Sequence, residues 1–158
     1  AFNIQTSPMI MEFVIDKDEK LFLLESVPEF GGEFIPDVMI PAATGYNHIR
    51  NSINASTGIN FREPGKKFLN VPVVVKYITG EHGILASCNT DTVKKLNGII
   101  FSRIFKDIGA NISPPASNHD RLGVIVAKGK TLEDAIEIAE FAESKMNIRI
   151  RKNETNEN

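Results

Sequence analysis

The sequence has a single cysteine, Cys88, which excludes both an internal disulfide framework and a cysteine-based structural zinc site. No apolar run approaches the roughly 20 residues that a membrane-spanning helix requires. A basic segment followed by an apolar one, as in a secretory signal, is also missing. The net charge of −2 creates no general attraction to nucleic acid or to an anionic membrane. We therefore expect a cytoplasmic protein that binds neither nucleic acid nor membrane.

The chain also lacks an initiator methionine, because it begins Ala-Phe-Asn-Ile and enters an expected strand almost at once. This start leads us to expect either a cut made inside a larger protein or a processed N-terminus. At the other end, residues 152–158 are polar and without periodicity, which predicts a disordered tail.

The composition that remains is that of a globular protein, with 158 residues of which 42% are apolar and 24% charged. This length is most simply one domain with a real core. Strand-like runs are interspersed with helical patterns, which predicts an α+β fold. We expect strands over residues 8–15, 21–26, 71–78, 84–88, 99–105, 122–127 and from 148 onward, and helices over residues 36–43, 46–57, 90–97 and 131–146.

The first two runs flank a polar turn and predict a β-hairpin, whose loop should exceed two residues because the turn lacks glycine. Each run contains one carboxylate, Glu12 and Glu25, and a carboxylate in a half-buried strand needs a partner. Opposed across the hairpin, the two could share Mg²⁺, which favours carboxylate oxygens and is completed by phosphates and water. The alternative is two strand-end glutamates that reach solvent. Strand alternation places Glu12 beside Ile10 and Val14, Glu25 beside Leu21 and Leu23, and Met9, Met11, Phe13 and Ile15 together on the other face of the first strand.

A loop is expected over residues 27–34, VPEFGGEF, which adds Glu29 and Glu33 to the nearby acids. Four acids near one loop repel one another unless a cation is present, or else they point into water. The pair Gly31-Gly32 permits backbone conformations that other residues avoid. Such a pair makes a turn or lets a substrate approach the main chain.

Other expectations concern positions outside this acidic region. The β-branched run at 71–78 is nearly continuous, which predicts a central or well-covered strand. Residues 80–83 predict a turn into a returning strand. His48 is expected on the solvent face of its helix, and Cys88 is expected to be a packed thiol.

The clearest helix is expected over residues 131–146. Thr131 caps it, with Asp134 three residues further on, in the manner of a capping box. Small alanines in its apolar stripe predict close packing on a sheet. The stripe comprises Leu132, Ala135, Ile136, Ala139, Ala142 and Met146.

Two blocks of sequence, taken together, resemble the ATP-grasp ligases. In the first, Glu12 is followed at a separation of 25 − 12 = 13 residues by Glu25-Ser-Val-Pro-Glu-Phe-Gly-Gly. That family has Glu-x-Asn-x-Arg-x-Gly-Gly about a dozen residues after a strand glutamate. The second block, residues 120–135 (DRLGVIVAKGKTLEDA), is similar to the last strand and helix of the small lobe appended to biotin-carboxylase-like and amino-acid-ligase members. The resemblance extends over nearly the whole chain, to about Ile150.

The resemblance implies an ATP-dependent carboxylate–amine or carboxylate–thiol ligase, which acts through an acyl phosphate on small-molecule carboxylate and amine substrates. By resemblance, Glu12 and Glu25 would be the Mg²⁺ ligands that bridge the ATP phosphates. Gly31 and Gly32 would belong to the same cofactor site. The family asparagine is Val27 here and the family arginine is Glu29. This chain is then either a divergent subgroup that uses Glu29 as an extra ligand, or a degenerate site. Residues 29–33 could supply replacement acids, and Glu29 and Glu33 are the expected catalytic residues.

The resemblance also implies a division of the chain. Residues 1–70 would be the distal part of an ATP-grasp domain, an antiparallel sheet with helices, and residues 71–151 a small β-rich C-terminal lobe. The lobes that should precede Glu12 are missing, so we expect the C-terminal part of a ligase that is inactive alone and completed by the N-terminal lobes of the same protein. Two alternatives remain open: a degenerate module for oligomerisation or partner binding, and an independent α+β domain with an accidental likeness. A homodimer is considered because a truncated sheet exposes an edge.

Overall fold

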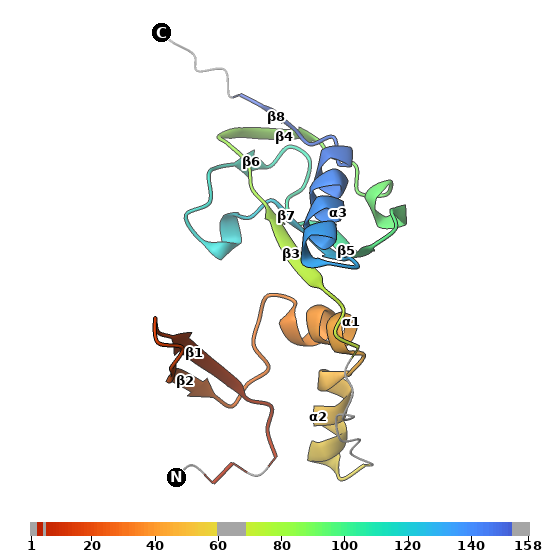
Figure 1. Cartoon of the computed structure of the whole chain (residues 1–158). Coiled ribbons are helices and arrows are strands. Elements are labelled where there is room, and N and C mark those ends of the chain that lie inside the picture. The colour runs from red at the N-terminus through yellow and green to blue at the C-terminus, as the bar shows by residue number, and fades with distance from the viewer. Residues whose placement is uncertain (1–2, 5, 60–68, 153–158) are drawn as a thin grey trace. The chain divides into compact units, whose positions relative to one another are not determined.

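The computed structural model describes residues 3–4, 6–59 and 69–152 of the chain. It divides into two compact units, residues 1–69 (unit 1) and 70–158 (unit 2), which are described separately (Figure 1). Short antiparallel sheets and a few helices confirm the predicted α+β class. Most of the predicted tail, residues 153–158, lies outside the described residues. Within those residues, no helix is long and apolar enough to cross a membrane.

Unit 1 begins with the predicted hairpin, formed by β1 (Ile10–Ile15) and β2 (Leu21–Val27). Its turn is closed by the Asp16 carboxylate, which accepts hydrogen bonds from the backbone N–H groups of Asp18 at 2.8 Å and Lys20 at 2.9 Å. Glu19 adopts a left-handed backbone conformation with φ of 59°. The loop therefore exceeds two residues, as the absence of glycine predicted.

The helical part of unit 1 is one nearly continuous run followed by a separate helix. The π-helical turn η1 (Ile35–Met39) passes directly into α1 (Ile40–Thr44), and α2 (His48–Thr57) follows. Pro41 lies in the first turn of α1, where proline is tolerated.

Unit 2 contains a three-stranded antiparallel sheet in the order β3–β7–β5, where β3 is Val73–Ile78, β7 is Gly123–Lys128 and β5 is Ile99–Ile104. Of the two alternatives expected for the first of these strands, central or well covered, the central position is wrong, because β3 lies at an edge and β7 in the middle. The central strand is the most deeply buried, with Val124 to Ala127 inaccessible to solvent. The β-branched residues of β3 reflect the helix that covers this strand. A strand at the edge of a sheet also needs apolar residues where a helix packs on it.

The strand that was expected to return beside β3 belongs to a second sheet. Strand β4 (Gly83–Ser87) pairs with β6 (Asn111–Ile112) and with β8 (Arg149–Arg151), in the order β6–β4–β8. Glycine fits best at position 80, between β3 and β4, because a Cβ there would lie only 2.6 Å from Ile150 and 2.7 Å from Ile112. The expected strand from residue 148 onward exists as β8, and Asn111 and Ile112 form a short strand in a stretch where no strand was predicted.

The helix expected at residues 90–97 is reduced to a single 3₁₀ turn, η2 (Val93–Lys95). The Asn89 side chain accepts from the backbone N–H of Asp91 at 3.1 Å, which starts the turn as an Asn cap does. Leu96 then adopts an extended conformation and Gly98 a left-handed one, so the chain leaves the helical region after one turn. A further 3₁₀ turn, η3 (Asn118–Asp120), precedes β7.

Helix α3 (Leu132–Lys145) packs on the three-stranded sheet, across which it lies in Figure 1. The predicted cap is present, because Thr131 Oγ1 accepts from the N–H of Asp134 at 3.1 Å. The alanine part of the predicted stripe is confirmed, with Ala135, Ala139 and Ala142 at most 1% exposed. The prediction is wrong for Leu132 and Ile136, which are 52% and 42% exposed. Ile138 packs against the core instead. Cys88 is half-buried against the same core.

We predict that Leu85→Ala in unit 2 lowers the free energy of unfolding by about 2–5 kcal/mol, because Leu85 is 0% exposed and its removal leaves a cavity. The matched control Leu132→Ala changes the same residue type at a site that is 52% exposed, and should stay within about 0.5 kcal/mol of the parent. Urea denaturation followed by far-ultraviolet circular dichroism measures both. Equal losses in the two variants would contradict the assignment of the core.

Candidate metal and nucleotide site

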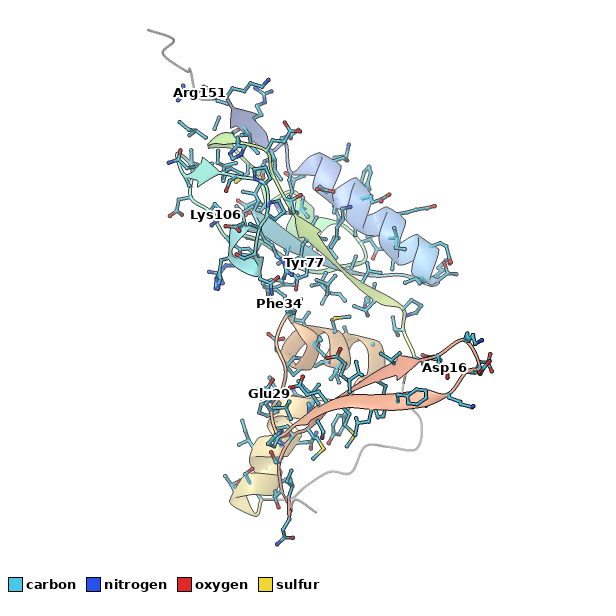
Figure 2. The ribbon with its side chains drawn as sticks, turned by 90° about the vertical axis from the view of Figure 1, so that its left-hand side faces the viewer. Asp16, Glu29, Phe34, Tyr77, Lys106 and Arg151 are labelled. Carbon is cyan, nitrogen blue, oxygen red and sulfur yellow. The ribbon has the colours of Figure 1, made fainter. Side chains whose placement is uncertain are left out.

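The hairpin brings the two predicted carboxylates directly opposite each other. Glu12 of β1 is the cross-strand partner of Glu25 of β2. Residues opposite each other in an antiparallel pair point to the same face, with Cβ atoms about 4.5–5.5 Å apart. The carboxylates therefore share one face of the hairpin, whose side chains are drawn in Figure 2 with Asp16 at the tip and Glu29 beyond the far end.

A β-bulge next to this pair changes the rest of the predicted face. Glu12 pairs with Glu25, but Phe13 pairs with Leu23, so Leu24 is an extra residue in β2. Beyond the bulge, Leu23 and Leu21 pair with Phe13 and with the end of β1, and they lie on the opposite face from Glu12. The prediction that Glu25 shares a face with Leu21 and Leu23 is wrong, because strict alternation does not survive an inserted residue.

The acid pair has no cationic partner within the described part of the chain. Both side chains are exposed, and no hydrogen bond or ion pair of the described residues involves Glu12 or Glu25. Like charges directly opposite each other in a sheet are destabilising. Among the described residues, no group of three or more histidine, cysteine, aspartate or glutamate side chains could hold a metal ion, so Glu29 and Glu33 do not join the pair. The pair supplies carboxylate oxygens only.

The loop after β2 is held by its glycine and by backbone hydrogen bonds. Gly31 has φ of 76°, and a Cβ there would lie 2.5 Å from Cδ1 of Ile10. Gly32 has open space around it, and its carbonyl accepts from the N–H of Ile35 at 3.2 Å. Glu33 is exposed and also left-handed, with φ of 60°. Gly31 thus has a structural reason to be glycine, whereas Gly32 has none within unit 1 as described.

An aromatic contact that the sequence did not reveal ties this loop to α2. The ring of His48 meets Phe30 edge-on at 5.5 Å between centroids and lies 6.2 Å from the ring of Tyr46. His48 is half-buried, so its expected place on the solvent face is wrong. Its position in the first turn of α2 lets it reach back to the loop, and periodicity within a helix cannot show such a contact.

In unit 2, Arg121 is held in a fixed orientation. Its guanidinium lies 3.6 Å from the ring centroid of Tyr77 and donates to Asn118 Oδ1 at 2.6 Å. The neighbouring Asp120 accepts from the hydroxyl and the N–H of Ser117, and these hydrogen bonds hold the pKa of Asp120 below its usual value. An oriented guanidinium suits a planar anion such as a carboxylate. Asp120 and Arg121 both lie in the second sequence block, residues 120–135, but no feature of that block predicted a functional role for Arg121.

Comparisons with known proteins give the context of these features. Residues 76–151 match the family model of the L-amino acid ligase C-terminal domain 2. Comparison with curated proteins finds no match. The chain is similar in structure to phosphoribosylglycinamide synthetase from Anaerococcus prevotii, with a TM-score of 0.79 and 17% identity over 94% of this chain and 38% of that one. It is also similar to L-amino acid ligase from Bacillus licheniformis, with a TM-score of 0.70 and 17% identity over 92% and 36%.

Two further similar structures contain nucleotide according to their descriptions. One is the biotin carboxylase–β-γ-ATP complex from Campylobacter jejuni, with a TM-score of 0.70 and 16% identity over 92% of this chain and 32% of that one. The other is the 2-oxoglutarate carboxylase biotin carboxylase domain dimer from Hydrogenobacter thermophilus with MgADP, with a TM-score of 0.67 and 18% identity over 91% and 32%.

These likenesses define the class: the chain has the fold of the C-terminal portion of an ATP-grasp ligase, and the resemblance stated from the sequence is confirmed. The match to the L-amino acid ligase C-terminal domain 2 model covers just under half of the chain. The chain spans between about a third and two fifths of the length of these structures, at 32–38%.

We predict that Gly31→Ala destabilises the hairpin and its loop by about 1–2 kcal/mol, because alanine is strained at a positive φ. Gly32→Ala is the matched control and should be nearly neutral, since nothing lies within 4 Å of its added Cβ. Gly31→Asn should lose less than Gly31→Ala, because asparagine tolerates the left-handed region. Amide hydrogen exchange of β1 and β2 measures the effect. Equal protection in both alanine variants would contradict this loop geometry.

Proposed function

We propose that this chain is the C-terminal part of an ATP-dependent ligase, which joins a small-molecule carboxylate to an amine or thiol through an acyl phosphate. The observation that carries the proposal is the direct cross-strand pairing of Glu12 with Glu25 without a cationic partner in the described chain. Two unrelieved like charges on one exposed face favour a bound cation. The L-amino acid ligase family match supports the reaction class.

The donor set fits Mg²⁺ as part of a nucleotide complex. Glu12 and Glu25 would hold the ion through carboxylate oxygens, and phosphate oxygens and water would complete the octahedron that Mg²⁺ demands. When bound, the ion neutralises the charge that develops during phosphoryl transfer. The MgADP and β-γ-ATP complexes among the structural neighbours support a nucleotide of this kind.

The loop after β2 would line the same site. Gly31 shapes the loop, with Ile10 filling the space beside it, and the open space around Gly32 leaves room for phosphate to approach the backbone. Glu29 and Glu33 are assigned as catalytic acids, because they are exposed on the loop that follows the metal pair. His48 acts only as a positioning residue here, through its contact with Phe30.

The chain would act only together with the N-terminal lobes of the same protein. Within the described residues, every fully buried large aliphatic side chain lies in unit 2. A unit that carries the metal pair but buries no aliphatic core of its own depends on further protein for stability. We place this ligase in the cytoplasm, where ATP and Mg²⁺ are available.

We predict that Glu12→Gln and Glu25→Gln each weaken Mn²⁺–ATP binding at least about tenfold, because an amide lacks the negative charge that the cation requires. The polypeptide to test is the longer one that contains this chain. Electron paramagnetic resonance of free Mn²⁺ measures affinity, and ATP consumption with a panel of carboxylates and amines measures activity. Glu19→Gln in the hairpin turn is the control and should bind normally. If Glu25→Gln binds as tightly as Glu19→Gln, or no acid and amine elicit ATP consumption, the proposal fails.

A non-catalytic module is the second candidate, and Val27 and Glu29 favour it. Valine has no donor atom for a metal ion, and Glu29 reverses the charge of the family arginine. The same fold would then serve oligomerisation or partner binding. The double change Val27→Asn with Glu29→Arg separates the candidates: unaltered nucleotide affinity supports the module, and tighter binding supports the ligase.

A further inference from the structure

The loop after β2 enters the helical run of unit 1 through two consecutive residues with left-handed backbone conformations. Glu33 has φ of 60°, and Phe34 has φ of 65° and ψ of 12°. Figure 2 shows Phe34 where this loop meets the helical run. Left-handed backbone is unfavourable for a residue with a Cβ, and a bulky residue there is a genuine outlier. Such strain persists only where the surrounding structure maintains it.

Phe34 differs from the other left-handed residues of the described chain. Among the described residues, the other non-glycine residues with positive φ are Glu19, Glu33, Asn70 and Asn147. Asparagine tolerates this region, and Glu19 lies in the tight turn of the hairpin. Phe34 is the aromatic member of this set, so its conformation needs a reason that residue type does not supply.

Glycine is present in the same loop but is not placed at the strained positions. Gly31 is left-handed, whereas Gly32, directly before Glu33, does not have a positive φ. A turn that had only to reverse the chain could use glycine at positions 33 and 34 without steric cost. This favours a role for the Glu33 and Phe34 side chains beyond the turn itself.

A second irregularity follows immediately and holds the backbone of Phe34. In the π-helical turn η1, the N–H of Met39 donates to the carbonyl of Phe34 at 2.8 Å. The N–H of Val38 donates to the same carbonyl at 3.3 Å. Pro36, in the first turn of η1, is buried. π-helical turns are rare and occur frequently at functional sites. The C-terminal side of Phe34 is therefore fixed, and the direction of the chain before it follows from its left-handed φ.

We propose that Phe34 is a positioning residue that acts through Glu33, because its left-handed backbone holds the Glu33 carboxylate in its catalytic orientation. This inference rests on the proposed function, in which Glu33 is a catalytic acid. Phe34 is half-buried, and Glu33 beside it is exposed. An anchored residue next to an exposed carboxylate restricts where that carboxylate can lie. Displacing a reacting group by about 1 Å can lower a rate about a hundredfold.

Two substitutions separate the backbone conformation of Phe34 from its ring. Phe34→Asn and Phe34→Val both remove the ring, but asparagine tolerates the left-handed region and a β-branched residue does not. In the longer polypeptide that contains this chain, Phe34→Val should lower kcat and kcat/KM for ATP consumption equally, at least about tenfold. Phe34→Asn should retain most of the activity. Ile35→Val, at a neighbouring residue that is 46% exposed, is the control and should behave as the parent.

A double-mutant cycle shows whether Phe34 acts through Glu33. Glu33→Gln should lower kcat by itself. Adding Phe34→Val to Glu33→Gln should lower kcat no further, because the group that Phe34 positions is already lost. Far-ultraviolet circular dichroism checks that each variant folds. If Phe34→Val does not fold, Phe34→Leu replaces it, because leucine is not branched at Cβ and is still disfavoured in the left-handed region.

Three results would overturn the proposal. Equal losses of kcat in Phe34→Asn and Phe34→Val would assign the effect to the ring. A further loss in the double variant would show that Phe34 does not act through Glu33. A fall of Mn²⁺–ATP affinity in Phe34→Val would show that the whole loop is disturbed. A parent that consumes ATP with no acid and amine contradicts the proposed function and this inference together, whereas an active parent with additive losses contradicts this inference alone.

Discussion

One inserted residue, Leu24, determines the character of the hairpin. Without the bulge, strict alternation would place Glu25, Leu23 and Leu21 on one face, and the acid pair would lie among leucines. With the bulge, Leu21 and Leu23 lie on the same face as Phe13. Toward the tip of the hairpin, the neighbours of the two carboxylates are then Val14 and Phe22. Bulges re-aim side chains next to functional sites. Here the bulge separates a charged face from an apolar one within a single pair of strands.

The two units differ in how far they bury apolar side chains. Unit 2 closes its core between α3 and the sheet of β3, β7 and β5, where small alanines let the helix approach buried β7. Unit 1 has hairpin side chains exposed on both faces and helices without a buried aliphatic core in the described residues. Unit 2 therefore has an apolar core formed by its own residues, whereas the described residues of unit 1 form none. The matched family model covers residues 76–151, which lie within unit 2.

Local chemistry made much of this predictable. The hairpin, the Thr131 cap of α3 and most strands follow from alternation and capping, which depend on neighbours in the sequence. The pairing of Glu12 with Glu25 was also anticipated as one of two alternatives. The errors concern long-range choices: β4 pairs with β8 instead of β3, and His48 meets Phe30 across a loop. A register shift caused by one residue is likewise invisible to a rule of strict alternation.

The departure at Val27 has a structural explanation. Val27 is the cross-strand partner of Ile10, and Ile10 in turn lies against the backbone of Gly31. The position where the ATP-grasp pattern has asparagine is thus part of an apolar contact that fixes the glycine loop to β1. An asparagine there would bring a polar group into this contact, at a cost unless it were hydrogen-bonded. At the proposed metal site the protein would contribute two carboxylates, so phosphates and water would supply the remaining ligands of the ion. Metal binding there would then depend more strongly on the nucleotide than binding at a site with a third protein ligand.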